Sequence, residues 1–313
     1  MQLTILICTH NRSELLERTL ASLNRAHRPA NCPANLLVVA NACTDNTMVF
    51  LEDYQTRAAE KDWLPLSWLA EATPGKSHAL NRAIPEIRSD LVALVDDDHR
   101  VDEGYLTGIC AAAGSYPDAA LFCGRILPDW DGSEPAWVHD TGPYRIYPLP
   151  VPRQDQGDSP HPIGREGSIP GGGNLLLRRP LFDRIGGFAT ALGPQGHNLG
   201  GGEDTDFVLR ALDAGEQLQY IPDVIQYHYV DPARLRLGYL LRKSFQRSRA
   251  GVQTGQMQPG VPAYMWRKLA EYVFHAVFSL RWAKKRFYLV RIAAVLGEIR
   301  GIQAQVIPVE DLL

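Results

Sequence analysis

The sequence has little cysteine and no long hydrophobic run, and each shortage excludes a class of protein. Its five cysteines are scattered through 313 residues and follow no metal-ligand spacing. We therefore expect reduced thiols in a cytosolic protein rather than a disulfide-stapled scaffold. The best candidate for a membrane span, residues 287–296, is short and contains Arg291. The first residues lack a basic region followed by an apolar stretch, so we expect no secretory signal.

The sequence has almost no excess of one charge, because 32 Lys/Arg nearly balance 35 Asp/Glu and the formal net charge is only −3. The charge is distributed unevenly, however. Residues 231–300 contain 14 Lys/Arg and 3 Asp/Glu, whereas the residues before them carry an acidic excess. The basic segment has no interleaved aromatic platform and no known nucleic-acid motif, so we expect no nucleic-acid partner.

The first 125 residues alternate strand and helix patterns. Apolar runs at 3–8, 36–39, 66–69 and 91–95 predict strands, and a helical segment follows each of the first three. Asn11, with Glu14 three residues later, is predicted to cap the first helix. Alternating units of this length predict a parallel sheet wrapped by helices.

The second half of the chain does not continue this alternation of strands and helices. Residues 128–170 are rich in proline and predict a long loop. Trp130 and Trp137 in this loop could stack on a ligand, close over the site as a lid or anchor the loop. Two short strands are expected at 217–221 and 224–228, around a turn at Pro222-Asp223. Beyond residue 232 the pattern is helical almost to the end.

Two acidic clusters carry the chemical signal. Asp96-Asp97-Asp98 follows a buried strand, where three like charges need a cation and where open α/β folds bind ligands. This position predicts a divalent metal that holds nucleotide phosphates, with a solvated acidic turn as the alternative. Glu203-Asp204 follows glycines 200–202 and begins a helix, so it forms either a catalytic pair or a helix cap.

The order of motifs along the chain resembles family 2 glycosyltransferases with the GT-A fold. The resemblance covers roughly residues 1–250 and is similar to soluble bacterial enzymes that build surface polysaccharides. It rests on segments 9–12, 41–45, 75–81, 96–98, 186–188, 202–204 and 222–228.

This resemblance implies an α/β fold with a Rossmann-like, mainly parallel, twisted sheet flanked by helices. It implies a catalytic domain at residues 1–230, with a nucleotide-binding half at about 1–125 and an acceptor half at about 126–230. Residues 231–313 would then form a C-terminal helical extension.

The resemblance also implies an inverting transfer of one sugar from a nucleotide diphosphate donor to a saccharide or lipid-linked saccharide. Asp204 would be the catalytic base, with Glu203 as its orienting partner. A carboxylate-held cation, Mn2+ or Mg2+, would stabilise the departing diphosphate. Its expected ligands are Asp98, Asp96 and His228, and the imidazole suits manganese better than magnesium.

A further set of residues is expected to contact the nucleotide and donor sugar. A UDP-sugar is favoured and a GDP-sugar stays open, because Ala40 and Asn41 stand where the family often has an acidic residue. Plain structural roles stay open for several members of the set. They are Thr9, Asn11, Arg12, Asn41, Lys76, Asp96, Asp97 and Asn174.

Two other functions stay open at this point. A nucleotidyltransferase acting on sugar phosphates would need a glycine-rich loop after the first strand, but residues 9–12 contain no glycine. A non-catalytic sugar-nucleotide binding protein would need neither metal nor base.

The C-terminal region raises a separate question. Residues 246–250 are similar to the Gln-x-x-Arg-Trp motif of processive members, but Ala250 replaces the tryptophan. A helix with an apolar face at 269–278 is expected to end in the basic run 284–286. It predicts either peripheral membrane contact or a docked helix, including one in a homodimer. We expect a cytoplasmic protein, with the inner face of the membrane as the alternative.

Overall fold

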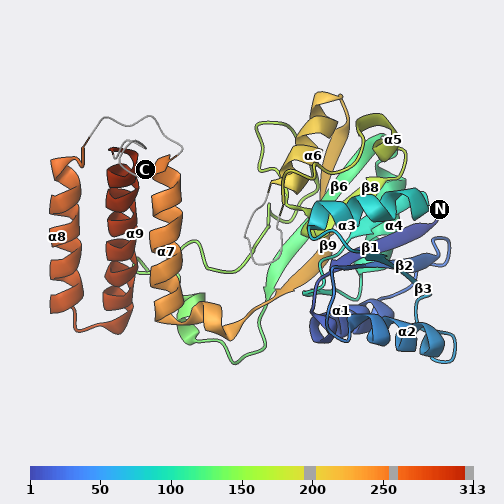
Figure 1. The fold of residues 1–313 in the computed structure, drawn as a ribbon, viewed down its shortest axis with the longest axis horizontal. Helices are drawn as coiled ribbons and strands as arrows, with labels where there is room; N and C mark the ends of the chain where they lie inside the picture. The colour runs from blue at the N-terminus through green and yellow to red at the C-terminus, as the bar shows by residue number, and fades with distance from the viewer. Residues whose placement is uncertain (194–201, 254–259, 307–313) are drawn as a thin grey trace. The chain divides into compact units, whose positions relative to one another are not determined.

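The chain folds into two compact units (Figure 1). The computed structural model describes residues 1–193, 202–253 and 260–306. The first unit comprises residues 1–129 and 152–229, and the second comprises residues 130–151 and 230–313. The second unit therefore includes part of the proline-rich segment as well as the C-terminal helices.

The first unit is built on one mixed sheet. Within the described residues it has nine strands in the order β3-β2-β1-β4-β8-β6-β9-β5, with β7 paired to β9. Strands β1 to β4 are mutually parallel, as are β6 and β9, whereas β8 runs antiparallel between β4 and β6. The bounds are β1 Leu3–Thr9, β2 Ala34–Asn41, β3 Leu66–Glu71, β4 Leu91–Leu94, β5 His99–Val101, β6 Ala119–Asp129, β7 His161–Ile163, β8 Leu175–Arg178 and β9 Gln217–Tyr229.

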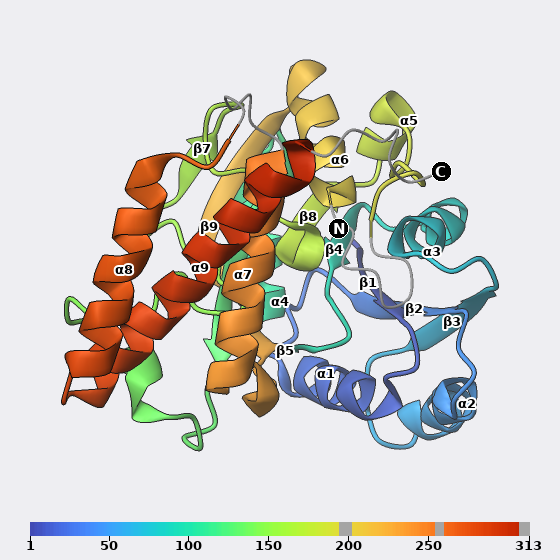
Figure 2. The ribbon, with the colours of Figure 1, turned by 60° about the vertical axis from the view of Figure 1, so that its left-hand side comes forward.

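Helices cover both faces of this sheet (Figure 2). Side chains alternate along β1, so Ile5 and Ile7 pack against α1, α2 and α4, whereas Leu6 packs against α3, α5 and α6. Because both faces of the sheet are covered, the central strands β1 and β4 are buried and mostly apolar. The expected α/β fold is confirmed. The helices are α1 Ser13–Arg25, α2 Thr47–Ala58, α3 Lys76–Ala83, α4 Tyr105–Ser115, α5 Leu181–Ile185 and α6 Glu203–Asp213.

The predicted cap of the first helix is wrong. Helix α1 begins at Ser13, and Arg12 occupies the cap position without a side-chain bond to the helix. Asn11 has a φ of 53°, and its side-chain oxygen accepts a hydrogen bond from the Thr44 backbone N–H at 2.7 Å. The left-handed backbone of Asn11 places it outside helix α1, so its side chain does not cap the helix. It joins the loop after β1 to the loop after β2 instead.

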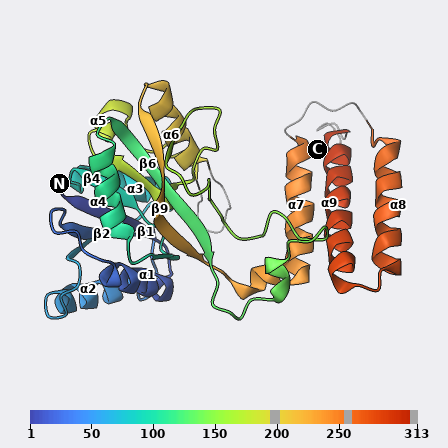
Figure 3. The same ribbon diagram turned by 180° about the vertical axis from the view of Figure 1, so that it is seen from behind.

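The two short strands expected near Pro222 are one strand. Figure 3 shows β9 running beside β6, and the pairing continues from Ala119↔Gln217 to Asp129↔Tyr229. A register shift between Cys123 and Arg125 absorbs the Pro222-Asp223 pair. Pro222, which has no backbone N–H, therefore lies at an irregularity of the β6–β9 pairing, where a regular inter-strand hydrogen bond is not required.

Two of the five cysteines are not free thiols. Cys32 and Cys110 form a disulfide, with a Cα–Cα distance of 6.5 Å, so the expectation of reduced cysteines is wrong for this pair. The two residues are 78 positions apart, and only the packing of the α4 side of the sheet brings them together. Cys8, Cys43 and Cys123 are free.

The second unit contains three long helices, α7 Leu237–Gln253, α8 Ala263–Phe278 and α9 Trp282–Val306. Helix α9 packs against both α7 and α8. The basic run 284–286 lies in α9, so the expectation that it ends the preceding helix is wrong, because the chain turns at residues 279–281. None of the described helices is both long enough and apolar enough to cross a bilayer.

A small apolar cluster holds the 130–151 segment in the second unit. Val138, Val151 and Leu235 form part of its buried centre, and Trp130 and Trp137 pack against them. The two tryptophans therefore anchor this segment, which is one of the three roles that the sequence leaves open.

The close crossing of α7 and α9 depends on glycine. A Cβ atom added at Gly297 would overlap the Phe245 backbone oxygen of α7. We expect Gly297→Ala to lower the free energy of unfolding by about 1–3 kcal/mol, because the helices must separate. Gly238→Ala in α7 meets no atom within 4 Å and should be neutral or stabilising by up to about 1 kcal/mol. Urea denaturation followed by circular dichroism measures both changes, and equal effects would contradict this account.

Candidate active site

One pocket of the first unit gathers most of the predicted site residues. It has a volume of about 260 Å³ and lies where β1, β2 and β4 end. Parallel strands bring their carboxyl ends to the same edge, so loops far apart in sequence meet there. The lining residues are Cys8, Thr9, His10, Arg12, Asn41, Pro74, Gly75, Lys76, Asp96, Asp97, Asp98 and His228.

The three carboxylates of the acidic triplet have different partners. Asp96 Oδ1 lies 2.8 Å from Lys76 Nζ. Asp97 accepts a hydrogen bond from Thr9 Oγ1 at 2.8 Å and one from Arg12 Nη1 at 3.1 Å. Arg12 also reaches Asp98 Oδ2 at 3.2 Å. Two cations from separate segments therefore neutralise the triplet: Lys76 pairs with Asp96, and Arg12 pairs with the other two carboxylates.

These partners act differently on the acidities. Burial tends to raise the pKa of Asp96, but the Lys76 ammonium outweighs it and holds that pKa well below its usual range. Burial, followed by repulsion from Asp98, raises the pKa of Asp97 to about 6. Asp96 is thus firmly ionised. Asp97 is poorly solvated, and its ionised form is stabilised by the hydrogen bonds from Thr9 and Arg12.

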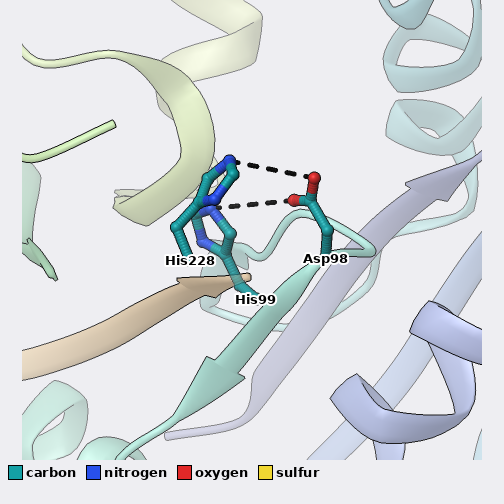
Figure 4. Close-up of side chains that lie close together, drawn as sticks. All are labelled: Asp98, His99 and His228. Atoms are coloured by element: carbon teal, nitrogen blue, oxygen red, sulfur yellow. Dashed lines mark ion pairs between the residues drawn. The ribbon is translucent and has the colours of Figure 1, made fainter. Parts of the chain in front are cut away.

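Asp98 converges with two histidines, as Figure 4 shows. His228 Nε2 lies 3.8 Å from Asp98 Oδ2, and His99 Nε2 lies 3.9 Å from Asp98 Oδ1. One ligand atom from each residue lies within 4.8 Å of the others. The expected metal ligands Asp98 and His228 therefore lie together with His99. Asp96, the third expected ligand, places its Oδ1 on Lys76 and its Oδ2 3.9 Å from His99 Nε2.

Hydrogen bonds fix which nitrogen of each histidine faces the site. His99 Nδ1 lies 2.5 Å from Gln226 Oε1, and Gln226 Nε2 is occupied as a donor to Leu94 O. His228 Nδ1 lies 2.6 Å from the Tyr229 carbonyl oxygen. Since both partners are acceptors, each Nδ1 carries a proton, so in the neutral ring the lone pair is on the Nε2 that faces the site. Two such nitrogens and one carboxylate suit a divalent transition metal, manganese included.

His99 is a site residue that the sequence does not reveal. It follows the acidic triplet directly, but its significance depends on the antiparallel pairing of β5 with β9, in which His99 stands opposite His228. His10 is a second pocket residue that the sequence does not single out. It lines the pocket and its Nδ1 lies 2.7 Å from the Asn41 carbonyl oxygen.

The second acidic cluster meets the first. Glu203 and Asp204 begin α6, and Asp204 Oδ2 lies 3.8 Å from Lys76 Nζ, the same ammonium that holds Asp96. A glycine turn fills the space between the clusters. A Cβ atom at Gly172 would overlap the Asp204 carboxylate, and one at Gly173 would lie 2.9 Å from Asp96 Oδ2. Gly200 and Gly201, expected to approach this cluster, lie outside the described residues.

Two carboxylate oxygens of this cluster are buried without a hydrogen-bond partner among the described residues. They are Glu203 Oε2 and Asp204 Oδ1. Burial and the neighbouring Asp204 charge raise the pKa of Glu203. Buried acceptors without a donor are costly in a folded protein, so such atoms mark places where a ligand can donate.

Three predicted contact residues serve the scaffold instead. Asn174 is buried, and its amide donates to the backbone oxygens of Arg125 and Val224, so we leave it out of the proposed donor site. Asn11 joins two loops and does not line the pocket. Asn41 lines it, but its side chain is used by the backbone of Thr73 and Gly75, so it shapes the loop before α3.

Comparison with known proteins gives one family match. The model of glycosyl transferase family 2 matches residues 4–186, which is more than half of the chain. The succinoglycan biosynthesis protein ExoM of Rhizobium meliloti (strain 1021) is 26% identical over 251 residues, covering 79% of this chain and 72% of ExoM. The glucosyl-dolichyl phosphate glucuronosyltransferase of Haloferax volcanii is 22% identical over 252 residues, covering 78% and 74%.

Solved structures show the same fold. TarS 1–349 of S. aureus, in complex with UDP-GlcNAc, has a TM-score of 0.55 at 14% identity and covers 97% of this chain and 91% of its own. The mannosyltransferase PcManGT of Pyrobaculum calidifontis, in complex with GDP-Man and Mn2+, has a TM-score of 0.53 at 18% identity, covering 95% and 86%. The expected GT-A architecture is thereby confirmed.

The metal ligands can be tested by titration with Mn2+. We expect His99→Ala and His228→Ala each to weaken Mn2+ binding by at least about tenfold, because each removes an Nε2 donor from the site. Asp96→Asn should have a smaller effect, since Lys76 holds that carboxylate. Isothermal titration calorimetry measures all three. His27→Ala, at an exposed position, is the matched control, and unchanged affinity in both histidine variants would refute the assignment.

Proposed function

Because this chain belongs to glycosyl transferase family 2 and is a glycosyltransferase, we propose that it uses a nucleotide diphosphate sugar as donor. The acceptor is a saccharide or a lipid-linked saccharide in polysaccharide biosynthesis, and the transfer inverts the anomeric carbon with the help of a divalent metal. The observation that supports this most is that Lys76 lies between Asp96 and Asp204. One ammonium group therefore contacts both acidic clusters, as the proposal of adjacent phosphate and base sites requires.

The metal would be held by Asp98, His99 and His228. Their convergence and the tautomers of the two rings favour Mn2+ over Mg2+, because imidazole nitrogen is a poor ligand for magnesium. When bound, the metal supplies positive charge that stabilises the departing diphosphate. Arg12, whose side chain is 47% exposed beside Asp98, can turn toward the same phosphates.

Asp204 is the proposed catalytic base. Its buried Oδ1 has no partner among the described residues, so it is available to an acceptor hydroxyl. As the acceptor oxygen attacks the anomeric carbon, its proton passes to Asp204 and the bond to the diphosphate breaks, the electron pair leaving with the diphosphate. Lys76 fixes the other oxygen of Asp204, and Glu203 beside it orients the acceptor.

The structure constrains the nucleobase of the donor less than it constrains the metal site and the catalytic base. Thr9, Arg12 and Asp97 form the nucleotide side of the pocket, while the amide of Asn41 is occupied by backbone groups. We favour a UDP-sugar and retain a GDP-sugar as the alternative. The similar structures were solved with UDP-GlcNAc in one case and GDP-Man in the other.

The second unit is proposed to touch an anionic membrane surface. Phe278, Leu280 and Trp282 are exposed around the turn between α8 and α9, with Leu280 at 102% relative exposure. Arg281 and the two lysines after it add positive charge at the same place. Exposed aromatic and aliphatic side chains flanked by basic residues suit the interface of an anionic bilayer.

Replacement of the proposed base separates catalysis from binding. We expect Asp204→Asn to lower the transfer rate by about 10²–10⁴-fold, because the proton acceptor is lost. Binding of UDP or GDP, measured by thermal shift, should survive. Asp206→Asn in the same helical turn, where Asp206 pairs with Arg210, is the control and should keep most of the activity. Full activity in Asp204→Asn would refute the assignment.

Vesicle sedimentation tests the membrane surface. We expect Trp282→Ala to reduce the fraction of protein bound to vesicles of phosphatidylcholine and phosphatidylglycerol several-fold, because an exposed apolar anchor is lost. Trp266→Ala is the control, since Trp266 is exposed to a similar degree, 50% against 57%, but lies in the first turn of α8. Equal loss in both variants, or no binding by the parent protein, would contradict the proposal.

A further inference from the structure

The second unit contains an open cavity that the transfer reaction does not use. Its volume is about 670 Å³. One wall is formed by the segment 141–150, and the others by the facing sides of α7 and α9. All of these residues belong to the second unit, so the cavity is complete within it.

The floor of this cavity is apolar. Ile146, Pro150 and Leu240 are buried there. Leu149, Phe287 and Val290 extend the same surface and are half-buried. Such a floor can accept several methylene or isoprene units of a ligand, each of which gains from leaving water.

The rim of the cavity is cationic. Arg145, Lys243, Arg247 and Arg291 line it, and its described lining contains no aspartate or glutamate. Among the described residues, Lys243 Nζ donates to the Pro150 carbonyl oxygen, at 3.4 Å. Partial burial lowers the pKa of Lys243, and repulsion from Arg234 and Arg247 lowers it further. Cationic side chains that lie close together without an acidic partner repel one another, and together they attract an anion.

A cationic rim above an apolar floor matches an amphiphile with a strongly charged head. Arginine and lysine are the usual partners of phosphate oxygens, and arginine can bind them through two parallel hydrogen bonds. An anionic polysaccharide would satisfy the rim but leave the floor exposed. A simple fatty alcohol would fill the floor but leave the charges unpaired.

We propose that this cavity binds a phosphate or diphosphate group carried by a long apolar chain, that is, a phosphorylated lipid. The site is separate from the nucleotide pocket, and the proposal stands whether or not the transfer reaction is assigned correctly. A lipid-linked saccharide presents this chemistry, so the cavity also narrows the class of acceptor to be tried first.

Calorimetric titration of the full chain with farnesyl phosphate tests the site. We expect the parent protein to bind it, and the double variant Lys243→Gln with Arg247→Gln to bind at least about tenfold more weakly, because two charge-assisted contacts are lost. Farnesol and inorganic phosphate should each bind much more weakly than farnesyl phosphate, since each satisfies only one part of the cavity.

The control variant is Arg267→Gln, which removes a charge from an exposed position of α8 outside the cavity. It should bind as the parent does, and so should Asp204→Asn, which separates failure of this site from failure of the proposed base. Equal affinity of the parent and the double variant would overturn the proposal. Inorganic phosphate binding as tightly as farnesyl phosphate would overturn the lipid assignment.

Discussion

The ammonium group of Lys76 holds the first unit's functional edge together. It lies 2.8 Å from Asp96 and 3.8 Å from Asp204, which come from opposite halves of that unit. Without a cation between them, these two partly buried carboxylates, with Glu203 beside them, would repel one another. Burial lowers the pKa of Lys76, but the two aspartates outweigh it and raise that pKa well above its ordinary value. The charge is therefore permanent, as a fixed link between two acidic clusters requires.

The strand order explains why these clusters can meet. Strand β8 inserts antiparallel between β4 and β6, so the glycine turn before it is delivered to the end of β4, beside Asp96. The long β9 runs beside β6 and brings His228 opposite His99. The site thus depends on a mixed sheet, since a purely parallel one would leave the turn and His228 at other edges.

The second unit uses charge differently. The first unit pairs Lys76 and Arg12 with carboxylates. The second displays arginine and lysine around an apolar cavity and beside exposed aromatic residues. Its helices approach closely because Gly297 leaves room for the α7 backbone. This arrangement suits contact with anionic amphiphiles, and it accounts for the strong basic excess of residues 231–300.

The α/β fold, the acidic triplet at a strand end and the pair that begins α6 could be predicted from the sequence, because apolar runs and the polar residues that end them are local properties. The partners of these residues depend on the tertiary structure. His99 lies beside Asp98 and His228, the Asn174 amide donates to backbone oxygens, and Cys32 is bonded to Cys110. Each of these depends on which distant segments pair and in which register, and a one-residue change of register would turn every side chain to the other face.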